Sequence, residues 1–310
     1  MPTLLQLTSL RPEIQSVLDS QFTVHHYAKL PDAAAWVTAH GAEVDAVATG
    51  GGNGIPTALM VALPNLKIVA INGVGFDKVD LEAARAQGVR VTNTPDVLTD
   101  DVADLAVGLT IGIMRRLHHA HRFVTAGHWP TKDWGLARKV SGKRFGILGM
   151  GRIGQAVARR LSGFDGTISY TDVAAKDVPY HFVPDLVQLA AGSDVLVVCA
   201  AASTATRAIV NGPVLDALGP EGALVNIARG SIVDEVALVA ALQSGALGAA
   251  ALDVFVDEPN VPAALLGMEN VLLTPHIASA TTETRRAMGM LMLDNLSSFF
   301  AGRPLPTPVV

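Results

Sequence analysis

The sequence Gly-Met-Gly-Arg-Ile-Gly begins at Gly149, between an apolar run that ends at Leu148 and a helix-like stretch over Gln155–Leu161. A G-x-G-x-x-G pattern between a strand and a helix predicts the phosphate-binding turn of a dinucleotide fold. Gly149 allows the tight turn, Gly151 lets the backbone approach a pyrophosphate, and Gly154 lets the helix pack closely on the strand. The N–H groups and the positive dipole end at the start of the helix would then face the phosphates.

The turn lies near the middle of a chain of 310 residues. A nucleotide-binding domain normally begins at its first strand, so the roughly 140 residues upstream must form something else, since a domain spans about 100 to 200 residues. The sequence therefore predicts two domains.

Short apolar runs alternate with helix-like stretches upstream of the turn. Five strands are predicted, over Leu4–Leu7, Phe22–His25, Ala46–Thr49, Ile68–Ile71 and Val89–Thr92. Helices are predicted between them, over Pro12–Asp19, Pro31–His40, Pro56–Leu63 and Leu81–Gln87. This alternation indicates a parallel sheet covered by helices on both faces.

A second series begins at the glycine turn. Six strands are predicted, over Arg144–Leu148, Thr167–Tyr170, Val195–Cys199, Ala223–Ile227, Ala249–Leu252 and Val271–Leu273. Two helix-like stretches, Thr99–His121 and Thr282–Phe300, are predicted to connect the domains. We therefore expect an α/β fold with two Rossmann-like βα domains and a cleft between them. The nucleotide-binding domain (residues 99–284) would be inserted into a flavodoxin-like substrate domain (residues 1–98 and 285–310).

The segment His121–Val140 fits neither series and contains Trp129 and Trp134. It is either a surface loop with two packed tryptophans or an arm that grips a second subunit. The arm is favoured because aromatic side chains are enriched at protein interfaces. The sequence thus predicts a homodimer.

Composition excludes several classes of function. Half of the residues are hydrophobic and the net charge is −5 without a run of Lys or Arg, so no nucleic-acid partner is expected. The single cysteine, Cys199, lies in an apolar run, which predicts a buried thiol and a reducing, cytoplasmic compartment. No span of about 20 residues lacks polar side chains, so no membrane segment is expected. No export signal is recognisable.

Asp172 follows Gly154 by 18 residues and lies at the end of the second predicted strand of the nucleotide domain. A carboxylate there can accept hydrogen bonds from the adenosine ribose hydroxyls, which favours NAD and repels the additional phosphate of NADP. The alternative is an ordinary aspartate in a turn.

Four ionisable residues follow the ends of later strands in the nucleotide domain, where a doubly wound sheet opens its crevice: Arg229, Asp253, Glu258 and His276. Arginine offers a planar fork to the carboxylate of a substrate. Histidine can give a proton to a carbonyl oxygen as hydride arrives, and a nearby glutamate can stabilise its protonated form. Each residue alone is more often a surface ion pair or a satisfied core group, but the set can reduce a 2-oxo acid.

Several ordered motifs make the chain resemble the D-2-hydroxyacid dehydrogenases, and within them the glyoxylate/hydroxypyruvate and hydroxyphenylpyruvate reductase branch. The motifs cover Asn93–Asp104, Gly149–Gly154, Asn226–Glu235, Leu252–Phe255, Asp257–Pro259 and Thr274–Ser279. The resemblance extends over nearly the whole chain. It implies an enzyme that uses NAD(P)H to reduce glyoxylate, hydroxypyruvate or a related small 2-oxo acid to a D-2-hydroxy acid.

The resemblance also implies roles for individual residues. Arg229 would bind and polarise the 2-oxo acid, and Glu258 would pair with His276, the proton donor. The loop Asn72–Gly75 would offer backbone N–H groups to the substrate carboxylate through Gly73, Val74 and Gly75, and Asp253 would hold the nicotinamide carboxamide. The full set of implied cofactor contacts is Gly149, Gly151, Arg152, Ile153, Gly154, Asp172, Thr206, Ile227, Arg229, Asp253, His276 and Ser279.

Two departures from the family pattern concern the cofactor. The chain reads Ala201–Thr206 where a Pro-Leu-Thr-Pro-Glu-Thr run is common, so the contacts on the adenine side are open. It reads Asp172-Val173 where the branch often carries Ser-Arg for the NADP phosphate. The branch resemblance thus favours NADP(H), whereas local electrostatics favours NAD(H). We expect NAD(H), because a carboxylate that faces the phosphate of NADP is unfavourable. NADP(H) is the alternative, since Lys176 could offset the charge of Asp172.

Two alternatives remain at this stage. His118, His119 and His121 suggest a metal site, but no carboxylate or cysteine at ligand spacing completes it, so no metal is expected. A dinucleotide-sensing regulator on the same fold could retain every catalytic residue without physiological turnover. Oxidation of NADH or NADPH in the presence of glyoxylate or hydroxypyruvate would distinguish the enzyme from the regulator.

Overall fold

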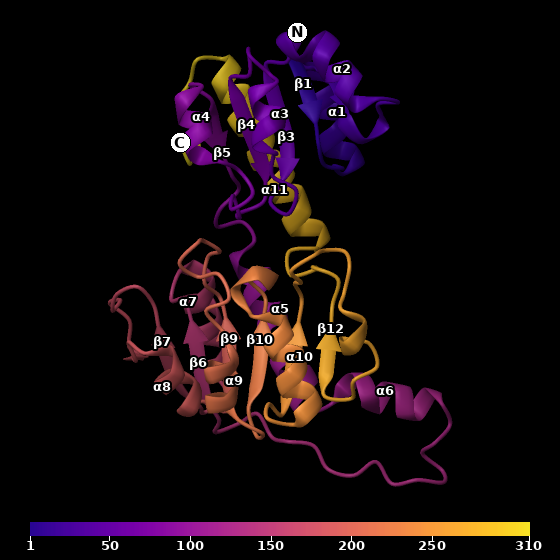
Figure 1. Ribbon diagram of the computed structural model, residues 1–310, viewed down its shortest axis with the longest axis vertical. Coiled ribbons are helices and arrows are strands. Elements are labelled where there is room, and N and C mark those ends of the chain that lie inside the picture. Colours follow the sequence, from indigo (N-terminus) through magenta and orange to yellow (C-terminus); the bar gives the residue numbers. More distant parts are fainter. The chain divides into compact units, whose positions relative to one another are not determined.

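The computed structural model describes all 310 residues and divides the chain into two units. The first unit comprises Met1–Leu98 and Thr281–Val310, and the second comprises Thr99–Ala280. Each unit is a parallel β-sheet with helices on both faces (Figure 1). The α/β class with two Rossmann-like units is therefore confirmed.

The sheet of the first unit has five parallel strands in the order β2-β1-β3-β4-β5, which is the flavodoxin-like order. Its strands are β1 (Thr3–Gln6), β2 (Thr23–His26), β3 (Ala46–Gly50), β4 (Ile68–Asn72) and β5 (Arg90–Thr92). All five were predicted from the sequence, with ends shifted by one residue or so. The inner strands β3 and β4 are specified well by sequence because they are buried, mainly apolar runs, whereas the edge strand β2 has no fully buried residue.

The helices of the first unit pack in two layers against this sheet. They are α1 (Pro12–Gln21), α2 (Ala33–His40), α3 (Thr57–Val61), α4 (Leu81–Ala86) and α11 (Thr282–Phe300), with 3-10 turns at Tyr27–Lys29 and Gly41–Glu43. Asp32 and Asp80 begin α2 and α4 by accepting hydrogen bonds from backbone N–H groups of the first turn. Gly289 lets α11 approach α1, since a Cβ there would lie 2.6 Å from Ile14 Cγ1.

The sheet of the second unit has seven parallel strands in the order β12-β11-β10-β9-β6-β7-β8. They are β6 (Arg144–Leu148), β7 (Thr167–Thr171), β8 (His181–Phe182), β9 (Val195–Val198), β10 (Ala223–Asn226), β11 (Ala249–Leu252) and β12 (Val271–Leu273). The prediction of six strands was wrong because it omitted β8. This edge strand has two residues, too few to form the apolar run that a sequence pattern requires.

The helices of the second unit cover both faces of its sheet. They are α5 (Thr99–Met114), α6 (Leu117–Thr125), α7 (Arg152–Ser162), α8 (Leu186–Ala191), α9 (Gly212–Leu218) and α10 (Glu235–Ser244), with 3-10 turns at Gly230–Ile232 and Ala263–Leu265. α5 packs against α7, whereas α9 packs between α8 and α10. The stretch predicted as one connector, Thr99–His121, is two helices, because Arg116 has a φ of +53° and ends the helical path.

None of the helices combines the length and the apolar composition needed to cross a bilayer. The cytoplasmic location stays a prediction.

Candidate active site

The glycine turn follows β6 and has the backbone geometry that its sequence predicts. Gly149 has a φ of +94°, and a Cβ there would lie 2.6 Å from the Cα of Ala200, just beyond β9. A Cβ at Gly154 would overlap the carbonyl oxygen of Gly149, whereas one at Gly151 would meet no atom within 4 Å. The outer glycines thus permit close packing, and the middle glycine leaves open space in front of the backbone.

Helix α7 begins directly after this turn. Gly151 is its N-cap and supplies no side-chain hydrogen bond to the first-turn N–H groups. Those N–H groups and the positive end of the helix dipole are available to an anion. The turn therefore fits the diphosphate of a dinucleotide.

Asp172 follows the last residue of β7 and reaches back to the glycine turn. Its Oδ2 accepts a hydrogen bond from the N–H of Met150 at 2.8 Å, and its Oδ1 accepts one from the N–H of Val173 at 2.7 Å. Lys176 Nζ lies 3.7 Å from Oδ1. The carboxylate is therefore fixed beside the glycine turn.

The other expected cofactor residues lie at the ends of the neighbouring strands. Ile227 follows β10 and is 5% exposed. Thr206 Oγ1 donates to the carbonyl oxygen of Ala201 at 2.8 Å and accepts from the N–H of Ser203 at 2.8 Å, so this loop is closed on itself. Ser279 lies in the segment after β12 and is half-buried.

Cys199 directly follows β9. The residue as a whole is half-buried, while its thiol is enclosed by the protein, as the apolar run predicted. Burial of the thiol raises its pKa to about 12. A thiol of that kind stays neutral and is a poor nucleophile.

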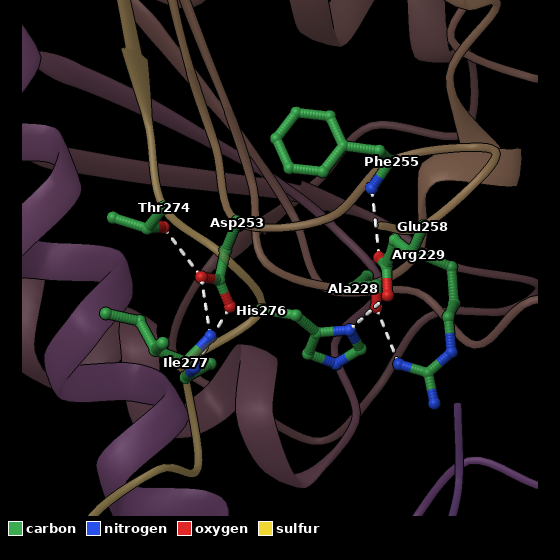
Figure 2. A network of polar contacts seen from close by, with 9 residues as sticks. Ala228, Arg229, Asp253, Phe255, Glu258, Thr274, His276 and Ile277 are labelled. Atoms are coloured by element: carbon green, nitrogen blue, oxygen red, sulfur yellow. Dashed lines mark hydrogen bonds and ion pairs between the residues drawn. The ribbon is translucent and has the colours of Figure 1, made fainter. Parts of the chain in front are cut away.

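Glu258 and His276 form a short polar contact in the second unit. His276 Nδ1 donates to Glu258 Oε2 at 2.6 Å, and the N–H of Phe255 donates to Glu258 Oε1 at 3.0 Å (Figure 2). Burial acts to raise the pKa of Glu258. The hydrogen bonds from His276 and Phe255, together with the charges of His276 and Arg229, outweigh burial and hold that pKa below its ordinary value of 4.5. Glu258 is therefore an anion that orients the imidazole ring and leaves Nε2 as the nitrogen able to meet a substrate.

Arg229 lies three residues beyond the end of β10, in a turn that Asn226 braces. Asn226 is 1% exposed, its Nδ2 donates to the carbonyl oxygen of Arg229 at 3.0 Å, and its Oδ1 accepts from the N–H of Ala228 at 3.1 Å. The guanidinium Nη1 donates to the carbonyl oxygen of Ala228 at 2.7 Å. Gly230 follows, and a Cβ there would overlap the backbone of Phe255, so this turn lies against the segment that leads to Glu258.

Asp253 follows β11 and is completely buried. Its Oδ1 accepts from Thr274 Oγ1 at 2.6 Å and from the N–H of Ile277 at 2.8 Å, and its Oδ2 accepts from the N–H of Ala278 at 3.0 Å (Figure 2). The side chain expected to hold the nicotinamide carboxamide thus faces the turn that carries His276.

The expected substrate loop belongs to the first unit and follows β4. Asn93 Nδ2 donates to the carbonyl oxygen of Val74 at 2.8 Å, and the N–H of Thr94 donates to that of Gly73 at 2.8 Å. A Cβ at Gly73 would lie 2.9 Å from the backbone nitrogen of Gly51, in the loop after β3. The carbonyl oxygens of Gly73 and Val74 are thus both fixed by hydrogen bonds from the segment after β5.

Sequence reasoning assigned no role to the residues that brace this loop. Thr307 Oγ1 donates to the carbonyl oxygen of Asn93 at 2.6 Å and accepts from Asn295 Nδ2 at 2.7 Å. Asn295 lies in α11 and is 0% exposed. A buried asparagine indicates a required hydrogen bond, but the sequence does not show which group it meets.

The histidines near the start of α6 do not form a ligand set. No group of three or more His, Cys, Asp and Glu side chains is placed to hold a metal ion. Burial lowers the pKa of His118 to about 4, and the positive charges of His119, Arg122 and Arg116 contribute in the same direction. His118 is therefore neutral near pH 7.

A glycine turn at a helix start, an acidic residue after the next strand and an Arg-Glu-His set at the carboxyl edge define a nicotinamide-dinucleotide-dependent oxidoreductase. The sequence model of the D-isomer specific 2-hydroxyacid dehydrogenase NAD-binding domain matches residues 107–278. The chain belongs to the D-isomer specific 2-hydroxyacid dehydrogenase family, whose members reduce 2-oxo acids to 2-hydroxy acids.

Individual relatives agree with this placement. The hydroxyphenylpyruvate reductase of Plectranthus scutellarioides is 46% identical over 307 residues, which are 99% of this chain and 98% of that protein. The solved 2-hydroxyacid dehydrogenase of Ketogulonicigenium vulgare is 51% identical with a TM-score of 0.92, covering 100% of this chain and 98% of that one. The NADPH-dependent glyoxylate/hydroxypyruvate reductase of Sinorhizobium meliloti, solved with NADP and malonate, is 41% identical with a TM-score of 0.92 and covers 100% and 97%.

Proposed function

We propose that the protein reduces small 2-oxo acids, such as glyoxylate and hydroxypyruvate, to D-2-hydroxy acids with His276 as proton donor. The observation that carries the proposal is the 2.6 Å contact between His276 Nδ1 and Glu258, next to the turn of Arg229. The two named substrates are those of the Sinorhizobium meliloti relative.

Each residue has a defined task in this reaction. When bound, the reduced nicotinamide supplies the hydride that adds to the substrate carbonyl carbon. Arg229 binds the carboxylate and polarises the carbonyl group. His276 Nε2 gives its proton to the carbonyl oxygen, while Glu258 holds the opposite nitrogen.

The N–H groups of the loop Gly73–Gly75 are proposed to bind the substrate carboxylate. Two buried polar atoms beside this loop, Asn72 Oδ1 and Thr94 Oγ1, have no hydrogen-bond partner. Unpaired polar atoms are costly in a protein interior, so their presence supports a polar ligand at this edge of the first unit.

An initial-rate panel tests the proposed reaction. NADH and NADPH are each combined with glyoxylate, hydroxypyruvate, pyruvate and phenylpyruvate. We expect turnover with glyoxylate and hydroxypyruvate, and chiral analysis of the product should give the D isomer wherever a stereocentre forms. Binding of either cofactor without oxidation by any of the four acids would instead favour the dinucleotide-sensing regulator.

We propose that NAD(H) is the preferred cofactor. The support is the fixed position of the Asp172 carboxylate, which the N–H of Met150 holds at 2.8 Å beside the glycine turn. A carboxylate facing the 2′-phosphate of NADP is a direct electrostatic penalty. The relative from Sinorhizobium meliloti is NADPH-dependent, so NADP(H) remains the alternative.

The ratio of kcat/KM for NADH to that for NADPH tests this preference. We expect the ratio to exceed about 10, and Asp172→Ser to lower it by about tenfold, since one unfavourable charge contact near a surface amounts to roughly 1 to 2 kcal/mol. Asp177→Ser, which removes an exposed charge from the same loop, is the control and should leave the ratio unchanged. A wild-type ratio below 1 would contradict the preference.

We propose that the predicted arm, His121–Val140, together with the preceding residues of α6 (residues 117–140 in all), mediates a homodimer. It exposes four large apolar side chains: Leu117 (51%), Val124 (52%), Trp129 (70%) and Leu136 (94%). Trp134 packs edge-on against Phe123 and contacts the Arg116 guanidinium, which stiffens the segment. Exposed apolar groups concentrated in one segment favour an interface over a simple surface loop.

Sedimentation equilibrium tests the dimer. The double variant Trp129→Ser, Leu136→Asp should shift the mass from two chains to one. Val61→Asp, which changes a 59% exposed valine in the first unit, should not alter the mass. A wild-type monomer would contradict the proposal.

A further inference from the structure

We propose that Asp253 is a positioning residue that holds the turn Thr274–Ala278 in the conformation that presents His276 to Glu258. This inference rests on the proposed role of His276 as proton donor. It gives Asp253 a task beyond the contact with the cofactor that the family resemblance implies.

Asp253 forms hydrogen bonds with residues that precede and follow His276 in the sequence. The carboxylate accepts from Thr274 Oγ1 at 2.6 Å on one side of the histidine, and from the N–H groups of Ile277 and Ala278 at 2.8 and 3.0 Å on the other. The backbone carbonyl of Asp253 accepts from the N–H of His276 itself at 2.8 Å. Asp253 thus contacts the side chain of Thr274 before His276, the N–H of His276 itself, and the N–H groups of the two residues after it; Figure 2 shows the carboxylate contacts to Thr274 and Ile277.

The backbone of His276 needs such a constraint. Its φ is +54°, in the left-handed region that side chains with a Cβ rarely adopt. Residues keep such conformations only where their surroundings over-determine them. With the turn held, the ring lies 2.6 Å from Glu258, so a relaxed turn would separate the pair that the reaction uses.

The chemical type of the anchor matters as well as its position. Asp253 is 0% exposed, and a buried carboxylate requires hydrogen-bond donors to offset the loss of water. Hydrogen bonds to a charged acceptor are shorter and roughly twice as strong as neutral ones. The neighbouring turn that carries Arg229 is braced by the neutral amide of Asn226 through two hydrogen bonds of 3.0 and 3.1 Å. The turn of His276 is held by three hydrogen bonds to one carboxylate.

This role is compatible with a cofactor contact but predicts different kinetics. The turn uses three of the roughly four acceptor positions of a carboxylate, which leaves one for a carboxamide. A cofactor anchor would act on the cofactor Kd, whereas a positioning residue would act on kcat at saturating cofactor.

Asp253→Asn separates the two roles because it preserves shape but presents an NH2 group to one of the buried donors. We expect kcat at saturating cofactor to fall by about 50-fold, the cofactor Kd to stay within about threefold, and the solvent deuterium isotope effect on kcat to rise as proton transfer limits the rate. A cofactor Kd raised about tenfold with kcat within about threefold of the wild type would overturn the proposal.

Hydrogen exchange supplies a readout that does not depend on activity. In the protein without cofactor, a peptide covering residues 274–280 should exchange about tenfold faster in Asp253→Asn, while exchange in β11 and α10 stays unchanged. Asp194→Asn is the matched control, since Asp194 also accepts a backbone hydrogen bond, from Arg144 at 2.8 Å. It should leave the turn unchanged. Wild-type exchange of this peptide in Asp253→Asn would overturn the proposal.

Thr274 provides a milder test in case Asp253→Asn fails to fold. Thr274→Val removes one hydrogen bond to the carboxylate and should lower kcat by about fivefold and speed exchange of the turn, whereas Thr274→Ser should retain both wild-type values. Wild-type behaviour of Thr274→Val would overturn the proposal. If the wild-type protein reduced no 2-oxo acid, the proposed function would fail, and exchange would still decide whether Asp253 holds the turn.

Discussion

Two loops, one in each unit, carry proposed substrate contacts, and they are built in opposite ways. The loop Gly73–Gly75 follows β4 and offers backbone N–H groups, whereas the turn Thr274–Ala278 follows β12 and presents one side chain, His276. Each is fixed by hydrogen bonds to a residue that directly follows a neighbouring strand. In the first unit the anchor is the neutral amide of Asn93, and in the second it is the buried carboxylate of Asp253.

The difference follows from what each loop must present. A backbone donor needs only close approach, so glycine suits the first loop, and neutral hydrogen bonds to the carbonyl oxygens of Gly73 and Val74 orient it. A proton donor must be aimed along one direction, which requires a fixed φ at His276 and charged bonds on both sides of it. Activity should therefore be sensitive to added side-chain volume in the first loop, and to the loss of polar atoms in the second.

The largest effect is expected at His276. His276→Gln should lower kcat by about 10² to 10⁴-fold, because general acid catalysis contributes on that order, with little change in KM or in the cofactor Kd. Steady-state rates and cofactor titration check this result. Turnover near that of the wild type would remove His276 from the role of acid and break the contrast between the two loops.

The second-largest effect is expected at Arg229, the other side chain of the second unit that is proposed to contact the substrate. Arg229→Lys should lower kcat/KM for a 2-oxo acid by about 100-fold, since an ammonium cannot replace a planar fork that also donates to the Ala228 carbonyl. The exposed Arg115→Lys is the control. Equal kcat/KM in the Arg229 variant and the wild type would show that the first-unit loop alone binds the carboxylate.

Gly73→Ala tests the sensitivity of the first loop to volume. The new Cβ would lie 2.9 Å from the backbone nitrogen of Gly51, so the loop must shift and KM should rise by about tenfold with a smaller change in kcat. Gly52→Ala places its Cβ where no atom lies within 4 Å and should behave as the wild type. A kcat effect without a KM effect would assign this loop a task other than binding.

The smallest effect concerns the stability that Glu258 contributes. Its pKa in the folded protein is below the ordinary 4.5, so its ionised form stabilises the fold above that pH, and this contribution is lost as the pH falls through the lowered value. Glu258→Gln should therefore lower Tm by a few °C at about pH 7, and the difference should shrink as the pH falls below 4.5. Thermal melts across this range check it. A difference that grows toward acid would reverse the sign and contradict the pKa shift.

Much of the fold and part of the site could be predicted from the sequence. The five strands of the first unit and the glycine turn were predicted because the alternation of strand-like and helix-like stretches and the spacing of glycines are local properties. The ionisable groups Arg229, Glu258 and His276 could be singled out because each follows a strand end. The edge strand β8 and the break at Arg116 were missed, since a two-residue strand and a single left-handed residue leave no periodic trace.

What the sequence determined by itself about this protein is the βα alternation, the dinucleotide turn at Gly149 and the set of groups that can do chemistry. Only the tertiary structure decided which residues hold those groups in place. Asp253 meets Thr274 across 21 residues, and Thr307 meets Asn93 across 214. The physical reason is that φ preferences and apolar periodicity act between near neighbours, whereas a buried hydrogen bond joins whichever groups the strand order brings to the same edge of a sheet.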